Sequence, residues 1–84
     1  MALTVRGKAK QILARRYARV LVPAGDGRFS ASIPAFPGCF SQGDSVVEAY
    51  TNLEIAATNW LMSCLEHGLK IPEPEPLTPP TPRA

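Results

Sequence analysis

The stretch "IPAFPGCFSQGDSVVEAY", residues 33–50, decides how the chain folds. It begins with prolines and glycines, which interrupt helices and strands. It then reaches Ser45 and Glu48, spaced as an S-x-x-E capping box, in which each side chain accepts a hydrogen bond from a backbone N–H that the first turn of a helix leaves unpaired. We therefore expect a rigid corner that ends a strand and turns the chain back as a helix.

The residues after this corner predict one long amphipathic helix. From residue 46, apolar side chains recur every three or four positions for about six turns, the period of an α-helix with one apolar side. Gly68 follows as a natural end, because glycine readily adopts the left-handed conformation that closes many helices. We interpret Tyr50 and Trp60 as core residues rather than as a ligand cage. The apolar positions are Val46, Ala49, Tyr50, Leu53, Ala56, Ala57, Trp60, Leu61, Cys64 and Leu65.

The residues before the corner predict two strands joined by a hairpin. "YARVLVP", residues 17–23, is rich in β-forming residues and stops at a proline. Asp26-Gly27 offers a tight turn, and "RFSASIP", residues 28–34, alternates apolar and polar side chains with the period of a half-buried strand. "CFSQG", residues 39–43, adds a third short strand. The predicted fold is α+β with the order β-β-β-α, a three-stranded antiparallel sheet with the long helix on one face.

The two ends of the chain differ from this central part. Residues 5–15 place apolar side chains at helical spacing, although Gly7 costs about 1 kcal/mol relative to alanine. Six of the nine prolines lie in residues 71–84, so we expect an extended or disordered tail there. We divide the chain into a basic N-terminal helix or arm at 1–16, the β-β-β-α domain at 17–70 and the proline-rich tail.

Charge is distributed unevenly, although the net charge is only +2. Six cations and no acid occupy the first twenty residues, and all seven acids follow them. Such a basic end is compatible with a weak nucleic-acid-binding arm, with a solvated helix face, or with a patch that meets the acidic body of a second subunit. The candidate nucleic-acid-binding residues are Lys8, Lys10, Arg15 and Arg16.

A core of roughly 70 residues is marginal by itself, so small domains often depend on a metal, a disulfide or another subunit. One histidine and two cysteines without ligand spacing exclude a structural metal, and we expect no cofactor. The N-terminus lacks the apolar core of a secretory signal and no segment suits a membrane span, so we expect a cytoplasmic protein with reduced thiols. Self-association into a dimer or tetramer, through a sheet edge or a helix face, is then the expected remedy.

The polar residues that could serve catalysis have simpler structural explanations. Asp26 lies in the hairpin turn, and Asp44 and Glu48 belong to the start of the long helix, so no carboxylates converge on a divalent cation. His67 adjoins the end of that helix, where a cation favours the helix dipole. Both cysteines suit small buried hydrophobic positions. We therefore expect neither catalytic residues nor an enzyme.

Between Tyr17 and Pro74 the sequence resembles the HicB-like antitoxin family. The family pattern combines an aromatic residue, Ile-Pro-x-x-Pro-Gly, Gly-Asp-Ser/Thr, x-x-Glu-Ala and a helix that closes on glycine and Ile-Pro-x-Pro. The matching positions are Phe29, Ile33, Pro34, Pro37, Gly38, Gly43, Asp44, Ser45, Glu48, Ala49, Gly68, Ile71, Pro72 and Pro74. The resemblance implies a truncated RNase H-like domain without its catalytic acids. It also implies a partner, a small basic HicA-type toxin that cleaves RNA.

The resemblance suggests our main hypothesis, an antitoxin-like protein that neutralises a HicA-type toxin by occluding its surface. Many family members also carry a C-terminal DNA-binding module, and the residues after Gly68 are too few to build one, so the chain departs from the family there. An exposed sheet edge can accept another chain, and acidic side chains can steer a cationic partner. The candidate partner-binding residues are Asp26, Phe36, Phe40, Asp44 and Glu54.

Two other hypotheses stay open at this point. An orphan, oligomeric nucleic-acid-binding module could work through the basic N-terminal helix, with weak, salt-dependent binding. An RNase H-like enzyme with an unrecognised site is the third possibility.

Overall fold

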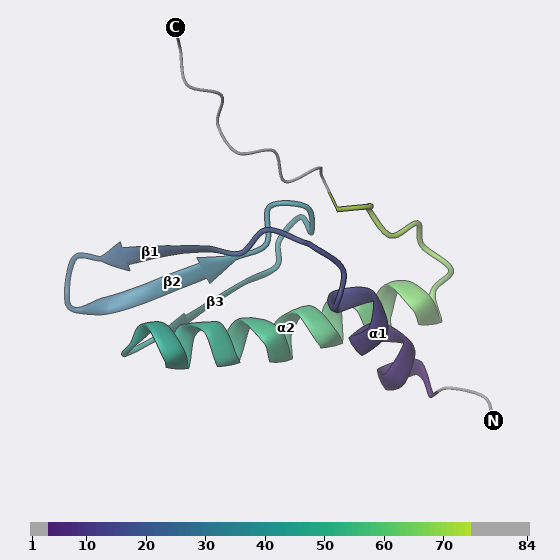
Figure 1. Ribbon diagram of the computed structural model, residues 1–84, viewed down its shortest axis with the longest axis horizontal. Helices are drawn as coiled ribbons and strands as arrows, with labels where there is room; N and C mark the ends of the chain where they lie inside the picture. Colours follow the sequence, from purple (N-terminus) through teal and green to yellow (C-terminus); the bar gives the residue numbers. More distant parts are fainter. Residues whose placement is uncertain (1–3, 75–84) are drawn as a thin grey trace, which may run out of the picture.

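The structure, a computed structural model, describes residues 4–74 and has the predicted α+β architecture. Both predicted helices and all three predicted strands are present, in the predicted order (Figure 1). The long helix packs against one antiparallel sheet, and the short helix precedes the first strand. The elements are α1 (Val5–Leu13), β1 (Val20–Ala24), β2 (Arg28–Ser32), β3 (Phe40–Gly43) and α2 (Val46–Glu66).

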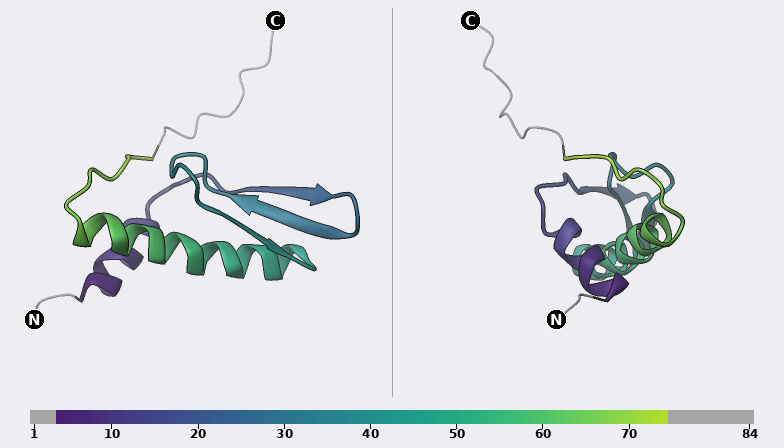
Figure 2. Two further views of the ribbon diagram at one scale, coloured as in Figure 1. Left: turned by 180° about the vertical axis from the view of Figure 1, so that it is seen from behind. Right: turned by 90° about the vertical axis from the view of Figure 1, so that its right-hand side faces the viewer.

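The sheet has the order β1-β2-β3, and both helices lie on the same side of it (Figure 2). Leu21, Ala31 and Ser41 stand opposite one another across the three strands. Residues that are opposite in an antiparallel sheet share a face, and the Ser41 hydroxyl donates to the Ala49 carbonyl of α2 at 2.8 Å. This row therefore faces α2, and the residues that alternate with it point to the other side.

The predicted cap of α2 is confirmed, with one difference. The Ser45 hydroxyl accepts from the Glu48 amide at 3.1 Å, whereas the Glu48 carboxylate accepts from the amide of Asp44, one residue earlier than a capping box predicts, at 3.0 Å. At the other end Gly68 has φ 64°, and the Leu69 amide donates to the Cys64 carbonyl at 2.9 Å. This is the hydrogen-bond pattern of a Schellman motif, so Gly68 ends the helix as expected.

The corner before β3 folds around Phe36. The Cys39 amide donates to the Phe36 carbonyl at 3.0 Å, and the Ile33 amide donates to the Cys39 carbonyl at 3.3 Å. The Phe36 ring stacks on Trp60 of α2 at a centroid distance of 4.6 Å, and Tyr17 packs against it at 4.5 Å. The Phe36 side chain is only 1% exposed, so the corner contributes to the core.

Residues on both sides of the predicted domain also join this core. Ala9 and Leu13 of α1 are buried in the same cluster as the α2 residues, so α1 is packed and is not a free arm. Ile71 packs against the cluster, and the Tyr17 hydroxyl donates to the Pro72 carbonyl. The start of the predicted tail therefore returns to the core, and residues 75–84 lie outside the described part.

Three positions of α2 differ from the predicted apolar pattern. Val46 and Tyr50, which belong to that pattern, are exposed, and Thr58, which lies outside it, is buried. The burial of Thr58 reflects the packing of α1 against α2, which a pattern read along one helix does not include. Thr58 tolerates burial because its hydroxyl donates to the Glu54 carbonyl at 2.8 Å.

At Gly43, the last residue of β3, the backbone of α2 comes so close that there is no room for a side chain. A Cβ at this position would come within 2.8 Å of the Glu48 carbonyl carbon and 2.9 Å of the Ala49 Cα. Because both neighbours are backbone atoms, we expect Gly43→Ala to lower the free energy of unfolding by about 1–3 kcal/mol or more in urea titrations. Gly25→Ala is the control, since nothing lies within 4 Å of its Cβ. Equal stability of the two variants would contradict the close packing.

Candidate partner-binding site

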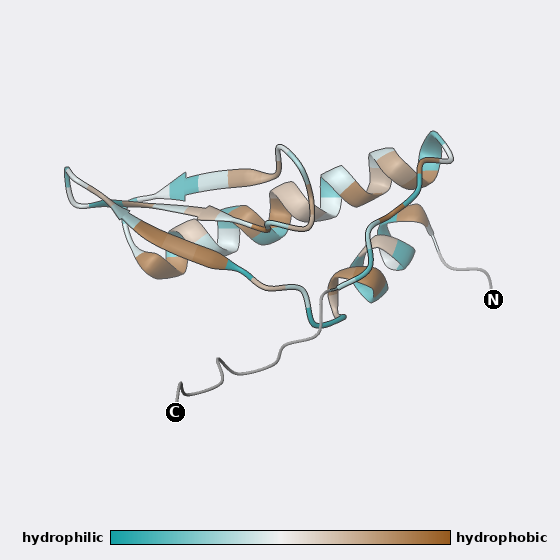
Figure 3. Cartoon of the chain, turned by 90° about the horizontal axis from the view of Figure 1, so that it is seen from above, coloured by the Kyte–Doolittle hydropathy of each residue, from teal (hydrophilic) through white to brown (hydrophobic). Residues whose placement is uncertain are grey.

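One face of the sheet is covered by no helix among the described residues. We call it the open face, and define it by the side chains that alternate with those facing α2. The apolar residues on it are well exposed, with Val20 at 41%, Val22 at 48% and Phe40 at 65%. Figure 3 views the molecule from above and shows β1 as mostly hydrophobic. The open face consists of Val20, Val22, Ala24, Arg28, Ser30, Ser32, Phe40 and Gln42.

Strand β1 also has a free backbone edge. Within the described part of the chain, β1 pairs only with β2. Pro23 lies in this strand and lacks an amide, so it offers no donor to an added strand. A strand from another chain could be added beside the residues of β1 that precede Pro23, as we expected from the sequence.

The predicted partner-binding aromatic residues behave differently from each other. Phe40 projects from the open face and is available to a partner. Phe36 is instead enclosed by Tyr17 and Trp60 in the core, so its place in our predicted partner surface is wrong. Both belong to the stretch that decides the fold, and only the tertiary packing distinguishes them.

Asp26 lies in the hairpin turn between β1 and β2, Asp44 follows β3 at the same end of the sheet, and both residues are exposed. The Asp26 carboxylate accepts from the Arg28 amide at 3.2 Å in the turn. Asp44 forms an ion pair with the Arg28 guanidinium at 3.2 Å, and the two side chains are highly exposed. Exposed pairs of this kind are weak, so both carboxylates can contribute to the field that a cationic partner meets.

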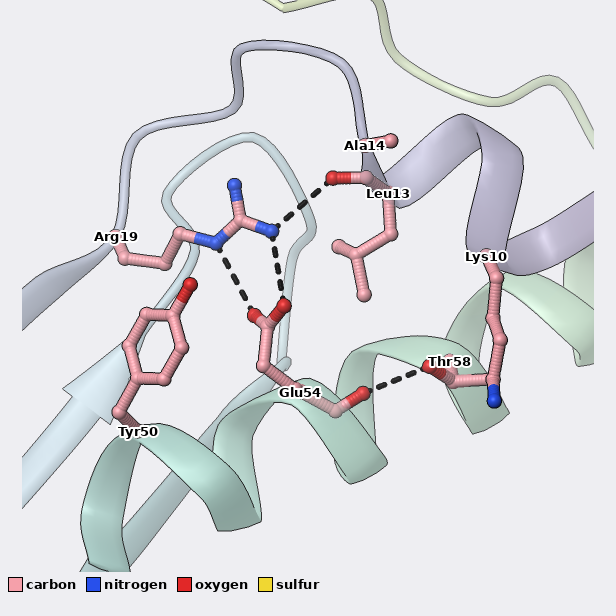
Figure 4. A pocket seen from close by; sticks show the side chains of 7 residues that line it. All are labelled: Lys10, Leu13, Ala14, Arg19, Tyr50, Glu54 and Thr58. Carbon is pink, nitrogen blue, oxygen red and sulfur yellow. Dashed lines mark hydrogen bonds and ion pairs between the residues drawn. The ribbon is translucent and has the colours of Figure 1, made fainter. Parts of the chain in front are cut away.

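Glu54 holds the linker between α1 and β1 against α2. Its carboxylate accepts two hydrogen bonds from Arg19, from Nε at 3.1 Å and from Nη2 at 3.2 Å (Figure 4). Arg19 also donates to the backbone carbonyls of Tyr17 at 2.8 Å and Leu13 at 3.1 Å. The charge of Glu54, which we expected to steer a partner, is therefore balanced within the molecule. The sequence carries no local signal for this pair, because its members lie 35 positions apart.

The Arg19–Glu54 pair crosses an open pocket between α1 and α2. The pocket has a volume of about 480 Å³ and lies on the same side of the sheet as both helices. Lys10 and Tyr50 stand at opposite ends of it in Figure 4. Its lining residues are Lys10, Leu13, Ala14, Arg19, Tyr50, Glu54 and Thr58.

The four predicted nucleic-acid-binding residues are all exposed. Lys8 and Lys10 lie on α1, and Arg15 and Arg16 follow it. Among residues 4–74, none of the four forms an ion pair. They are thus held at one end of the molecule, away from the hairpin and its carboxylates (Figure 1).

Residues that could support metal or thiol chemistry are not grouped. No set of three potential metal ligands occurs within residues 4–74. Cys39 and Cys64 are both free and buried. Burial raises the pKa of the Cys39 thiol, and the negative charge of Glu54 raises this pKa further. The described helices include none that is long and apolar enough to cross a membrane.

Comparisons with known proteins identify relatives of this fold and sequence. The profile described as the HicB-like antitoxin of bacterial toxin–antitoxin systems matches residues 17–81. UPF0150 protein Ta0767 of Thermoplasma acidophilum is 35% identical over 68% of this chain and 83% of its own length. UPF0150 protein ssl0259 of Synechocystis is 37% identical over 70% of this chain and 81% of its own length. The crystal structure of TTHA0281 from Thermus thermophilus superposes with a TM-score of 0.63 and 25% identity, over 84% of this chain and 86% of that one.

Two ion pairs among the described residues allow a matched comparison of stability. Replacing Glu54 by alanine leaves the half-buried Arg19 without its anion, and we expect the free energy of unfolding to fall by about 1–3 kcal/mol. Replacing Asp44 by alanine breaks the exposed pair with Arg28 and should change it by about 0.5 kcal/mol or less. Urea denaturation monitored by Trp60 fluorescence measures both values. An Asp44 effect as large as the Glu54 effect would refute the structural role of Glu54.

Proposed function

The chain belongs to the HicB-like antitoxin family of bacterial toxin–antitoxin systems, and from this premise we propose that it binds and neutralises a small basic RNA-cleaving toxin of the HicA type. It acts in this proposal by covering the toxin's RNA-cleaving surface, and it breaks no bond itself. The cytoplasmic location and the reduced thiols that we expect from the sequence fit this role. We also propose that the fold is a truncated RNase H-like domain.

The observation that carries this proposal is the uncovered open face. Interfaces obtain most of their affinity from a few buried aromatic and apolar anchors. Phe40 is the most exposed of the aromatic and large apolar residues on this face and is the natural anchor, with Val20 and Val22 beside it on the same face. A toxin that rests here removes all three from water.

The acidic residues near the open face also favour it as the surface that binds a basic toxin. Asp26 and Asp44 lie at the hairpin end of the sheet, and their field attracts a cationic protein and raises its rate of association. The family match begins at residue 17 and therefore includes the whole open face but not α1. The part of the chain shared with the family is thus the part that presents this surface.

We also propose that two copies of the chain associate along the free edge of β1. Main-chain hydrogen bonds across this edge would join two three-stranded sheets into one, and the exposed groups of an edge strand favour such pairing. The two copies meet edge to edge, so the open face stays accessible to a toxin in each copy.

Mutation of the anchor tests the toxin-binding proposal. We expect Phe40→Ala to weaken binding to a small basic HicA-type toxin by about tenfold or more, because aromatic anchors dominate many interfaces. Tyr50→Ala is the matched control, since Tyr50 is an exposed aromatic residue on α2, on the other side of the sheet. Isothermal titration calorimetry gives the affinities, and growth rescue in co-expression gives the biological effect.

The possible results distinguish two errors, a wrong antitoxin function and a wrong binding surface. If the wild-type chain neither binds a toxic neighbour nor relieves its toxicity, the antitoxin function is wrong. If it binds and rescues but Phe40→Ala does so equally well, the function stands and the open face is the wrong surface.

Light scattering tests the association of two copies. We expect a mass of twice 9.1 kDa at micromolar concentration. Val22→Lys should shift the protein towards the monomer, because a lysine on an edge strand opposes strand addition. Val47→Lys places the same charge on exposed α2 and should leave the dimer intact. A wild-type monomer at these concentrations would rule out the edge pairing.

A further inference from the structure

We propose that α1, the turn after it and the pocket between α1 and α2 form a binding site for single-stranded nucleic acid. The cations of α1 and the turn contact the phosphates, and one unpaired base enters the pocket beside Tyr50. This site lies outside the open face and does not depend on the antitoxin function.

The charge of this end of the molecule fits a polyanion. The described residues before the hairpin include no acid, and the cations on α1 and in the turn after it are exposed without ion pairs. The nearest acid of α2, Glu54, is balanced by Arg19. The cations in question are Arg6, Lys8, Lys10, Arg15 and Arg16. Binding through such groups releases counterions from the nucleic acid and is strongly salt-dependent.

The packing of α1 argues against insertion of this helix into a lipid surface. Membrane-bound amphipathic helices insert their apolar side between lipids. The apolar side of α1 is already used, because Ala9 and Leu13 are buried against α2. Apart from Val5 at its first position, the exposed side of the helix is mainly polar and cationic.

The pocket adds a feature that phosphate contacts alone do not explain. Its volume of about 480 Å³ falls in the range of sites that hold small ligands. Tyr50, which is 42% exposed, offers an aromatic ring at one end, and Lys10 offers a cation at the other (Figure 4). Proteins that bind single strands combine these two elements, a basic track for the backbone and aromatic rings on which bases stack.

The base must be unpaired to reach this pocket. A base within a duplex is stacked and paired, and extruding it costs free energy. A base in a single strand can enter at little cost, and its ring N–H or amino group can donate a hydrogen bond to the Glu54 carboxylate, which lines the same pocket. The site should therefore favour a single strand over a duplex of equal length.

Fluorescence anisotropy with the full chain tests the proposal. The probes are a labelled oligouridylate and a labelled oligothymidylate of about 15 nucleotides, long enough for one such site, and a DNA duplex of the same length. At least one single strand should bind more tightly than the duplex. With about four phosphates contacted, its affinity should fall about 50-fold between about 50 and 200 mM salt.

Single substitutions then separate the two parts of the site. Tyr50→Ala should weaken single-strand binding about fivefold or more through the lost stacking. Lys10→Gln should make the salt slope shallower by about 0.7, the contribution of one phosphate. Arg28→Gln removes the same charge at the hairpin end, and Phe40→Ala removes an aromatic ring from the open face, so both serve as controls without effect. Circular dichroism verifies that each variant is folded.

Several results would overturn the inference. The first is the absence of binding by either single strand, and the second is a duplex that binds as tightly as the single strands. A third is an unchanged affinity of Tyr50→Ala for the single strand. That result would show that no base stacks on Tyr50 in the pocket. A fourth is self-association that Lys10→Gln abolishes without any binding of nucleic acid, since the basic surface would then serve a second copy. Tyr50→Ala tests nucleic-acid binding and is the control for toxin binding, whereas Phe40→Ala tests toxin binding and is the control for nucleic-acid binding. A negative result for nucleic acid therefore leaves the toxin-binding proposal unaffected.

Discussion

The burial of Phe36 between Tyr17 and Trp60 is the contact on which the other features of the structure depend. Its three rings come from the linker before β1, the corner before β3 and the long helix α2. Aromatic pairs of this kind add about 0.5–1.5 kcal/mol each beyond the area they bury. Trp60 also donates to the Pro37 carbonyl at 3.1 Å, and Tyr17 donates to Pro72. The stack therefore fixes the linker, the corner and the segment after α2 against one another.

This arrangement concentrates the packing on one side of the sheet and leaves the other side open. Both helices lie under the same face, and Arg19 and Glu54 fasten the linker there. A small domain that packs in this way presents two unlike surfaces. One is the open face, with exposed apolar residues among polar ones and carboxylates nearby. The other is the cationic end formed by α1, with a pocket beside it. A basic protein and a polyanion would be recognised by opposite ends of the same molecule.

Elements with a strong local pattern were predictable from the sequence. The S-x-x-E pair at Ser45 and Glu48 and the glycine at 68 each set a limit of α2 through nearby backbone hydrogen bonds, and the apolar period predicted the helix between them. The alternation in β2 likewise predicted which side of the sheet is covered. Positions governed by two elements were not predictable. Thr58 is buried where α1 packs on α2. Glu54 pairs with Arg19 because the linker between α1 and β1 lies against α2.

The sequence by itself determined the helices, the strands, the hairpin and the family, because these depend on contacts within a few residues or on the spacing of a motif. Only the tertiary structure decided which of the apolar side chains outside the regular patterns are buried and which are exposed to solvent. Phe36 and Phe40 are four positions apart and chemically identical, yet one is enclosed by two rings and the other stands on the open face. The physical reason is that burial is a property of the neighbours that distant segments bring together, and no local pattern specifies them.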